Sequence, residues 1–194
     1  MPVETAQLKK AELVELIKLD STIQLDIRYA TLNNFIKKPV YKEARAFLQR
    51  PAAEQLVLAN TDLKKLGYRL LVFDGYRPWS VTKLFWDHTS KKNKKFVADP
   101  KKGSRHNRGC AVDVSLFEMA TGKEVSMPGV YDENSERSYP SYSGGTAEQR
   151  AARDLLKKTM ESHGFTVYEF EWWHFDFNDW KSYPLLNIPF HDIK

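Results

Sequence analysis

Cysteine is nearly absent from this sequence, and no long hydrophobic run occurs in it. The single cysteine, Cys110, excludes an internal disulfide bond, and we expect it to be a small buried core residue. No segment approaches the roughly 20 consecutive apolar residues that a membrane-spanning helix requires, so we predict no membrane span. The first residues lack the basic flank and apolar run of a signal peptide. We therefore expect a cytoplasmic protein as the chain is written, and a periplasmic one if the chain is a processed form.

The chain also lacks internal repeats, and its 194 residues, 42% of them apolar and 28% charged, suit one domain over residues 1–194. Its net charge of +5 is partly concentrated between Lys91 and Arg108, where Asp99 is the only acid. Such a basic run binds nucleic acid or an anionic surface in some proteins, and steers acidic substrates as a solvated loop in others. No nucleic-acid-binding signature accompanies it, so we favour the loop and predict no nucleic-acid partner.

Apolar periodicity predicts a mixture of helices and strands. The predicted helices cover an N-terminal extension within residues 1–20, residues 42–66 with a break at Arg50 ahead of Pro51, residues 79–86, and a segment from the capping box at Thr146 to Gly164. The predicted strands cover residues 23–29, 68–73, 109–116 and 170–177, and residues 121–145 are expected to be irregular. Helices and strands do not alternate strictly, so we predict an α+β fold with a central, largely antiparallel sheet flanked by helices.

Two remote polar clusters contain residues that suit metal chemistry: His106 with Asp113, and Glu171 with His174. Two imidazoles and one carboxylate are a usual ligand set for a catalytic zinc ion, which keeps a fourth position for water. The remaining acid, Glu171, is then a candidate general base. The alternative is that the histidines are structural and Glu171 is a surface acid. The aromatic and acidic composition of residues 169–177 favours a functional strand over an ordinary exposed one.

The spacing of Glu171 and His174 sets a geometric condition on this hypothesis. Residues three apart on a regular strand face opposite sides of the sheet. If both side chains address one metal ion, the strand must be bulged there or end near Trp173.

Taken together, these motifs resemble a known family. The pattern Ser104-x-His106-x-x-Gly109-x-Ala111-x-Asp113, followed by Glu171-Trp172-Trp173-His174, is similar to the signature of zinc D-alanyl-D-alanine dipeptidases. These enzymes are related to the vancomycin-resistance dipeptidase and, more distantly, to zinc D,D-carboxypeptidases and the Hedgehog signalling domain. Asp74-Gly75-Tyr76-Arg77-Pro78 and the stretches at 26–31 and 132–138 extend the resemblance from about residue 23 to residue 180. Cys110 departs from it, since serine or another small residue is expected there.

The resemblance implies a Hedgehog- or D,D-peptidase-like fold and a role for each matched residue. One Zn²⁺ per chain would be bound by His106, Asp113 and His174. Glu171 would be the base and Arg77 would stabilise the oxyanion. The alternative for Arg77 is a purely structural ion pair with Asp74. Both can hold, because Asp74 would orient the guanidinium.

The resemblance also implies how a small substrate is bound. Asp132 would bind the substrate ammonium with Tyr29 nearby, while Ser104 and Arg108 would face the carboxylate. The implied reaction is hydrolysis of D-Ala-D-Ala, or close D,D-dipeptides, to free amino acids. The alternative is a zinc D,D-carboxypeptidase on longer cell-wall peptides, which present no free amine to Asp132. A third hypothesis is a zinc-stabilised binding module. The presence of the candidate base Glu171 argues against it, because such a module needs no base. The sequence leaves the oligomeric state open.

Overall fold

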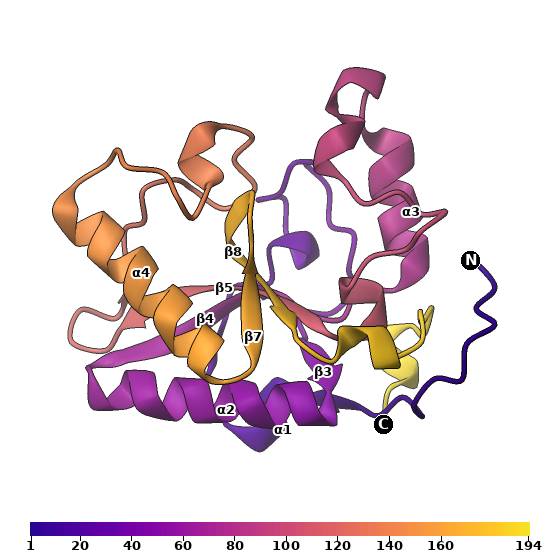
Figure 1. Ribbon diagram of the computed structural model, residues 1–194, viewed down its shortest axis with the longest axis horizontal. Helices are drawn as coiled ribbons and strands as arrows, with labels where there is room; N and C mark the ends of the chain where they lie inside the picture. The colour runs from indigo at the N-terminus through magenta and orange to yellow at the C-terminus, as the bar shows by residue number, and fades with distance from the viewer.

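A six-stranded sheet lies at the centre of the computed structural model, which describes residues 1–194 except for the side chains of residues 95 and 96 (Figure 1). Its main strand order is β2 (Gln24–Leu25), β4 (Tyr68–Asp74), β5 (Ala111–Glu118), β8 (Glu171–Phe177) and β7 (Phe165–Tyr168), and β6 (Lys123–Glu124) pairs with β5. Only the β2–β4 pair is parallel. The predicted α+β fold with a largely antiparallel sheet is therefore confirmed.

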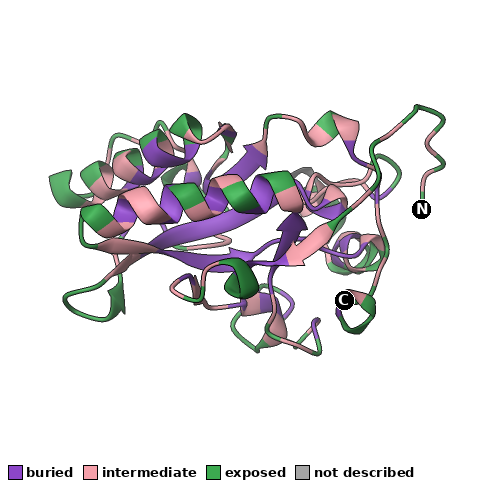
Figure 2. Cartoon of the chain, turned by 90° about the horizontal axis from the view of Figure 1, so that it is seen from below, coloured by how far each residue is buried: buried purple, intermediate pink, exposed green. Residues whose placement is uncertain are grey.

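Two long helices, α2 (Arg50–Lys65) and α4 (Ala147–Ser162), contact each other and the sheet (Figure 1). Helix α2 begins where predicted, with Pro51 in its first turn, where a missing N–H costs nothing. The capping box of α4 at Thr146 and Gln149 is present. Figure 2 shows both helices striped with buried and exposed residues, while the central strands are buried along most of their length. This is the pattern of amphipathic helices that cover a sheet.

A shorter helix, α3 (Trp79–His88), and a 3-10 helix, η2 (Lys91–Phe96), stand at the opposite end of the molecule from α4 (Figure 1). The remaining 3-10 helices are η1 (Arg28–Ala30), η3 (His106–Arg108), η4 (Glu136–Ser138), η5 (Trp180–Ser182) and η6 (Phe190–Asp192). Among the described residues, none of these helices has both the length and the apolar character needed to cross a bilayer.

The predicted helical extension within residues 1–20 is much shorter than expected. Only α1 (Leu16–Leu19) is helical there, and β1 (Leu13–Glu15) pairs with β3 (Phe47–Gln49). Upstream of β1, the Lys9 N–H donates to the Ser182 carbonyl at 2.8 Å. These long-range partners satisfy backbone groups that a helix would satisfy internally, so tertiary contacts override the local helical pattern.

Two other predicted elements are shorter than expected. The helix predicted over residues 42–66 exists only from Arg50, because β3 occupies Phe47–Gln49. The strand predicted over residues 23–29 pairs only at Gln24–Leu25 before η1 begins. Strand β7 was not predicted; its pairing partner is β8, which follows it directly in the sequence.

Two irregularities in strand pairing determine which side chains meet. In β4, Val72 lies opposite Val114 and Asp74 lies opposite Asp113, so the intervening residue is bulged. Asp113 in turn lies opposite His174 in β8. The bulge therefore places Asp74, Asp113 and His174 in one row across β4, β5 and β8, where opposite side chains are within contact range.

The second irregularity lies between β7 and β8. Val167 pairs with Phe175, but the next residue, Tyr168, pairs with Glu171, so residues 172–174 form a bulge in β8. Of the two alternatives set by the spacing of Glu171 and His174, the structure has the bulge, because β8 does not end near Trp173.

Candidate active site

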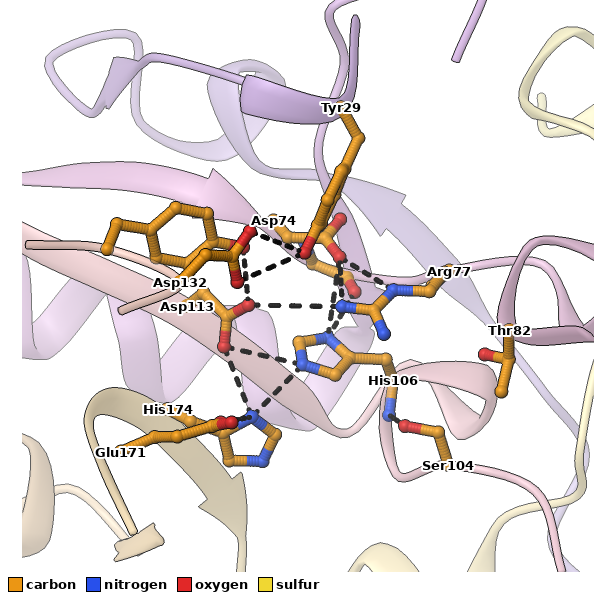
Figure 3. A network of polar contacts seen from close by, with 12 residues as sticks. Tyr29, Asp74, Arg77, Thr82, Ser104, His106, Asp113, Asp132, Glu171 and His174 are labelled. Carbon is orange, nitrogen blue, oxygen red and sulfur yellow. Dashed lines mark hydrogen bonds and ion pairs between the residues drawn. The ribbon is translucent and has the colours of Figure 1, made fainter. Parts of the chain in front are cut away.

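The structure brings the three predicted ligands together at one end of the sheet (Figure 3). Asp113 comes from β5, His174 from β8 and His106 from η3, and one possible ligand atom of each lies within 4.8 Å of the others. His106 Nε2 lies 3.1 Å from His174 Nδ1, and Asp113 Oδ1 lies 3.4 and 3.1 Å from these two nitrogens. Three donor atoms on separate elements therefore converge on one point.

The outer nitrogen of each histidine has a defined partner. His106 Nδ1 lies 2.7 Å from the Gly75 carbonyl oxygen, which can only accept, so this nitrogen carries the proton. His174 Nε2 lies 3.0 Å from Asp176 Oδ1 and donates to that carboxylate. The inner nitrogens, His106 Nε2 and His174 Nδ1, consequently turn their lone pairs toward each other.

Asp113 completes a donor set that fits a metal cation. Its Oδ2 accepts a hydrogen bond from the Tyr131 hydroxyl at 2.9 Å, whereas Oδ1 is buried and has no hydrogen-bond partner among the described residues. Lone pairs from two rings and one carboxylate thus face a common point, and a cation there would satisfy all three. Zinc commonly binds such a set, with its histidines fixed by outer hydrogen bonds as they are here.

Protons compete with a cation for the same atoms. Burial lowers the pKa of His174, but its close contacts with the carboxylates of Asp113 and Asp176 outweigh burial and raise the pKa to about 10. Burial likewise opposes ionisation of Asp113, yet His106 and His174 together hold its pKa well below the usual range. Since metal ligands must be deprotonated, affinity for a metal should fall in acid.

Glu171 lies beside this cluster because of the bulge in β8. Its Oε2 is 3.6 Å from His174 Nδ1, and 30% of its side chain is exposed. Burial raises the pKa of Glu171, and the opposing attraction of His174 only partly offsets this effect. A carboxylate with a raised pKa next to a metal site can accept and release a proton near neutral pH.

Arg77 is held firmly by the end of β4. Its Nε and Nη2 donate to Asp74 Oδ2 at 2.9 and 2.7 Å, and its guanidinium carbon lies 5.3 Å from the Tyr29 ring centroid and 4.9 Å from that of Phe85. Nη2 also lies 4.0 Å from Asp113 Oδ2. Asp74 therefore orients the guanidinium beside the candidate metal ligands, as expected.

The segment that carries Arg77 also fixes His106. A Cβ atom added to Gly75 would lie 2.8 Å from the Phe47 carbonyl oxygen, so only glycine fits where this carbonyl must meet the imidazole. The Arg77 N–H donates to the His106 carbonyl at 3.1 Å, and the buried Asn107 amide donates to the Arg77 carbonyl at 2.8 Å. The histidine loop and the arginine are thus joined into one unit.

Asp132 and Tyr29 form a second acidic point near the ligands (Figure 3). The Tyr29 hydroxyl donates to Asp132 Oδ2 at 3.0 Å. Asp132 has a φ of 61°, a left-handed conformation that is strained for a residue other than glycine and is often found at functional sites. Burial, reinforced by the nearby charge of Asp113, raises the pKa of Asp132 to about 7.

Ser104 and Arg108 differ in their placement. Ser104 Oγ accepts the His106 backbone N–H at 3.2 Å, which leaves the hydroxyl proton available to another acceptor. Arg108 donates to Glu4 at 2.6 Å and to the Tyr183 carbonyl, so its guanidinium is committed to the two ends of the chain. The expectation that Arg108 faces a substrate carboxylate is therefore wrong.

Sequence reasoning missed the residues that hold the ligands in place, chiefly Tyr131 and Asp176. Tyr131 directly precedes Asp132, and Asp176 lies two positions beyond His174 on the same face of β8. Only that spacing of two could have pointed to Asp176.

Known dipeptidases are similar to this chain over most of its length. The chain matches the D-ala-D-ala dipeptidase family over residues 9–192. The D-alanyl-D-alanine dipeptidase of Escherichia coli (strain K12) is 31% identical over 175 residues, which are 90% of this chain and 89% of that protein. That of Enterococcus faecalis (strain ATCC 700802 / V583) is 37% identical over 184 residues, covering 84% of this chain and 89% of that protein.

Among solved structures, the LdcB LD-carboxypeptidase aligns with a TM-score of 0.52 at 20% identity, over 96% of this chain and 80% of that one. At this identity the likeness shows a shared fold alone. The family match, by contrast, spans residues 9–192, nearly the whole chain. This protein therefore belongs to the D-Ala-D-Ala dipeptidase family.

Proposed function

We propose that this protein hydrolyses D-Ala-D-Ala, or a closely related D,D-dipeptide, to free amino acids with one Zn²⁺ bound by His106, Asp113 and His174. The observation that carries the proposal is the convergence of two imidazole lone pairs and an unpartnered carboxylate oxygen beside Glu171. The names of the relatives support the choice of substrate, since both are D-alanyl-D-alanine dipeptidases.

The donor set suits zinc in a catalytic role, because three protein ligands leave a coordination position open. Bound there, zinc would supply Lewis acidity and lower the pKa of a water molecule to roughly 7. His106 and His174 keep their donor nitrogens turned inward because their outer N–H groups are bound to Gly75 and Asp176.

Glu171 would move the protons of the reaction. It accepts a proton from the water that attacks the peptide carbonyl, and then passes that proton to the departing amine. Its raised pKa suits this role, because a carboxylate with a higher pKa is a stronger base toward water, and the departing amine is still basic enough to take the proton from it. The bulge in β8 is what allows one short segment to provide both this base and His174.

Arg77 would stabilise the negative charge that develops on the carbonyl oxygen. Its Nη1 makes no hydrogen bond to a described residue, while Nε and Nη2 are held by Asp74. A guanidinium fixed in this way loses little orientational freedom when the charge forms, which is the condition for effective electrostatic stabilisation.

Asp132 and Ser104 would recognise the two charged ends of a free dipeptide. The carboxylate of Asp132, held by the Tyr29 hydroxyl, would accept hydrogen bonds from the substrate ammonium. The hydroxyl of Ser104 can donate to the substrate carboxylate, because its oxygen already accepts from the His106 N–H. A charged group that leaves water needs such a partner.

Substrate length distinguishes this function from its main alternative, a zinc D,D-carboxypeptidase on longer cell-wall peptides. The zinc-restored protein should release D-alanine from D-Ala-D-Ala, and much less from N-acetyl-D-Ala-D-Ala or from a pentapeptide ending in D-Ala-D-Ala. Preferential cleavage of the pentapeptide would support the carboxypeptidase instead. Bound zinc without hydrolysis of any peptide tested would point to a zinc-stabilised binding module.

A further inference from the structure

Behind His174, away from the other ligands, a chain of contacts leads to the protein surface. His174 Nε2 donates to Asp176 Oδ1 at 3.0 Å, and Arg105 Nη1 donates to Asp176 Oδ2 at 2.6 Å. The Asp176 side chain is 9% exposed and that of Arg105 is 36% exposed. Each oxygen of this nearly buried carboxylate thus accepts a hydrogen bond from a different residue.

Local structure keeps this chain in place. His174 and Asp176 are two apart on β8 and therefore lie on the same face of the sheet. The Arg105 guanidinium lies 4.7 Å from the Trp180 ring centroid, where a cation is attracted to the aromatic face. A cavity of about 310 Å³, lined in part by Arg105, Asp176 and Trp180, opens beside the pair.

The two histidines differ in what fixes them. His106 donates to the neutral Gly75 carbonyl, whereas His174 donates to a carboxylate that an arginine partly neutralises. A carboxylate partner makes an imidazole a stronger electron donor and fixes its tautomer, and loss of such a partner typically costs 10–100-fold in metal affinity.

We propose that Asp176 is a positioning residue for the metal site, and that Arg105 holds its carboxylate so that the His174 ring stays in the orientation in which Nδ1 faces the other two ligands. This inference rests on the metal site of the proposed function. It does not assign either residue to contact with substrate.

The isosteric change Asp176→Asn isolates the effect, because asparagine offers one acceptor and one donor in place of two acceptors. If the side-chain oxygen of the introduced asparagine accepts from His174, its NH2 group faces the Arg105 N–H, and two donors oppose each other. If its amide faces His174, the ring must carry its proton on Nδ1, which blocks the metal. Changing Arg105→Met as well removes this conflict, since the amide can then turn to water in the adjoining cavity.

The test measures the dissociation constant for zinc by competition with a chromophoric chelator, and records the absorption spectrum of the Co²⁺-substituted protein. Asp176→Asn should raise the constant by about 10–100-fold and alter the Co²⁺ spectrum. The double variant Asp176→Asn/Arg105→Met should bind zinc more tightly than Asp176→Asn alone. A purely structural role for Asp176 would not produce this rescue.

Asp179→Asn is the matched control, since it breaks an exposed ion pair with Lys9 at 2.6 Å and touches no candidate ligand. It should leave zinc affinity unchanged. Zinc affinity of Asp176→Asn equal to that of the wild type, or a double variant no tighter than the single one, would overturn the inference while the metal site itself stands. A wild-type protein that binds no zinc would instead overturn the proposed function, and this inference with it.

Discussion

Replacement of Arg77 by lysine should abolish most of the turnover while leaving the metal site intact. Lysine keeps the positive charge but lacks the planar fork through which arginine binds Asp74 and presents its remaining nitrogen. The two hydrogen bonds of Nε and Nη2 to Asp74 Oδ2, at 2.9 and 2.7 Å, cannot both be formed by one ammonium that also reaches the carbonyl oxygen.

The expected magnitudes follow from these contacts. Loss of a donor aimed at the developing oxyanion costs about 10²–10³ in kcat, equivalent to about 2.7–4 kcal/mol. Asp74 is only 1% exposed, so water cannot replace the lost bond, and a hydrogen bond to a charged group contributes about 1.5–3 kcal/mol to stability. Arg77→Lys should therefore be moderately less stable and at least a hundredfold slower.

Steady-state release of D-alanine from D-Ala-D-Ala, zinc content and urea unfolding separate these effects. Turnover should fall while KM changes little and zinc content stays at one per chain, because Arg77 touches no zinc donor atom directly. A variant that carries zinc and retains a kcat within about threefold of the wild type would refute an oxyanion role for Arg77.

Three further predictions concern the surrounding residues. Burial raises the pKa of Asp132 to about 7, so the acid limb of the kcat/KM profile should lie at lower pH in Asp132→Asn. At pH 8 this variant should also have a lower kcat/KM than the wild type, because asparagine is not a charged partner for the substrate ammonium. The native state binds this proton more tightly than the unfolded state does, so the free energy of unfolding of the wild type should fall as pH rises from about 4 to about 7. Asp132→Asn should lack this contribution, and urea unfolding at several pH values measures the difference. Tyr131→Phe removes the hydrogen bond to Asp113 Oδ2 and should weaken zinc binding by about 10–100-fold in a chelator competition. Gly75→Ala places a Cβ 2.8 Å from the Phe47 carbonyl and should lower the free energy of unfolding by about 1–3 kcal/mol, measured with urea.

The candidate ligands were predictable because their residue types and motifs are distinctive. The hypothesis that Glu171 and His174 address one centre predicted either a bulge or a strand end near Trp173, and the pairing of Tyr168 with Glu171 shows that β8 is bulged. The two strands β4 and β5, with their compact apolar runs, were also predictable from composition.

The remaining features depend on contacts between distant segments, which local patterns do not encode. The extended path before β1 follows from pairing with residues near Ser182, against a local helical pattern. Arg108 lies within the histidine motif, yet its partner is Glu4 at the other end of the chain. The outer partner of His106 is a backbone carbonyl, that of Gly75, which carries no side-chain signal at all.

The most direct test of the central claim is a comparison of Glu171→Gln with the wild type for zinc content and D-alanine release in the same preparation. Glutamine keeps the size of the side chain but cannot accept the proton, and Glu171 is not among the three converging ligands. Full zinc occupancy with turnover reduced by at least about 10²-fold is the predicted result. Loss of zinc from the variant, or unimpaired release of D-alanine, would contradict the account.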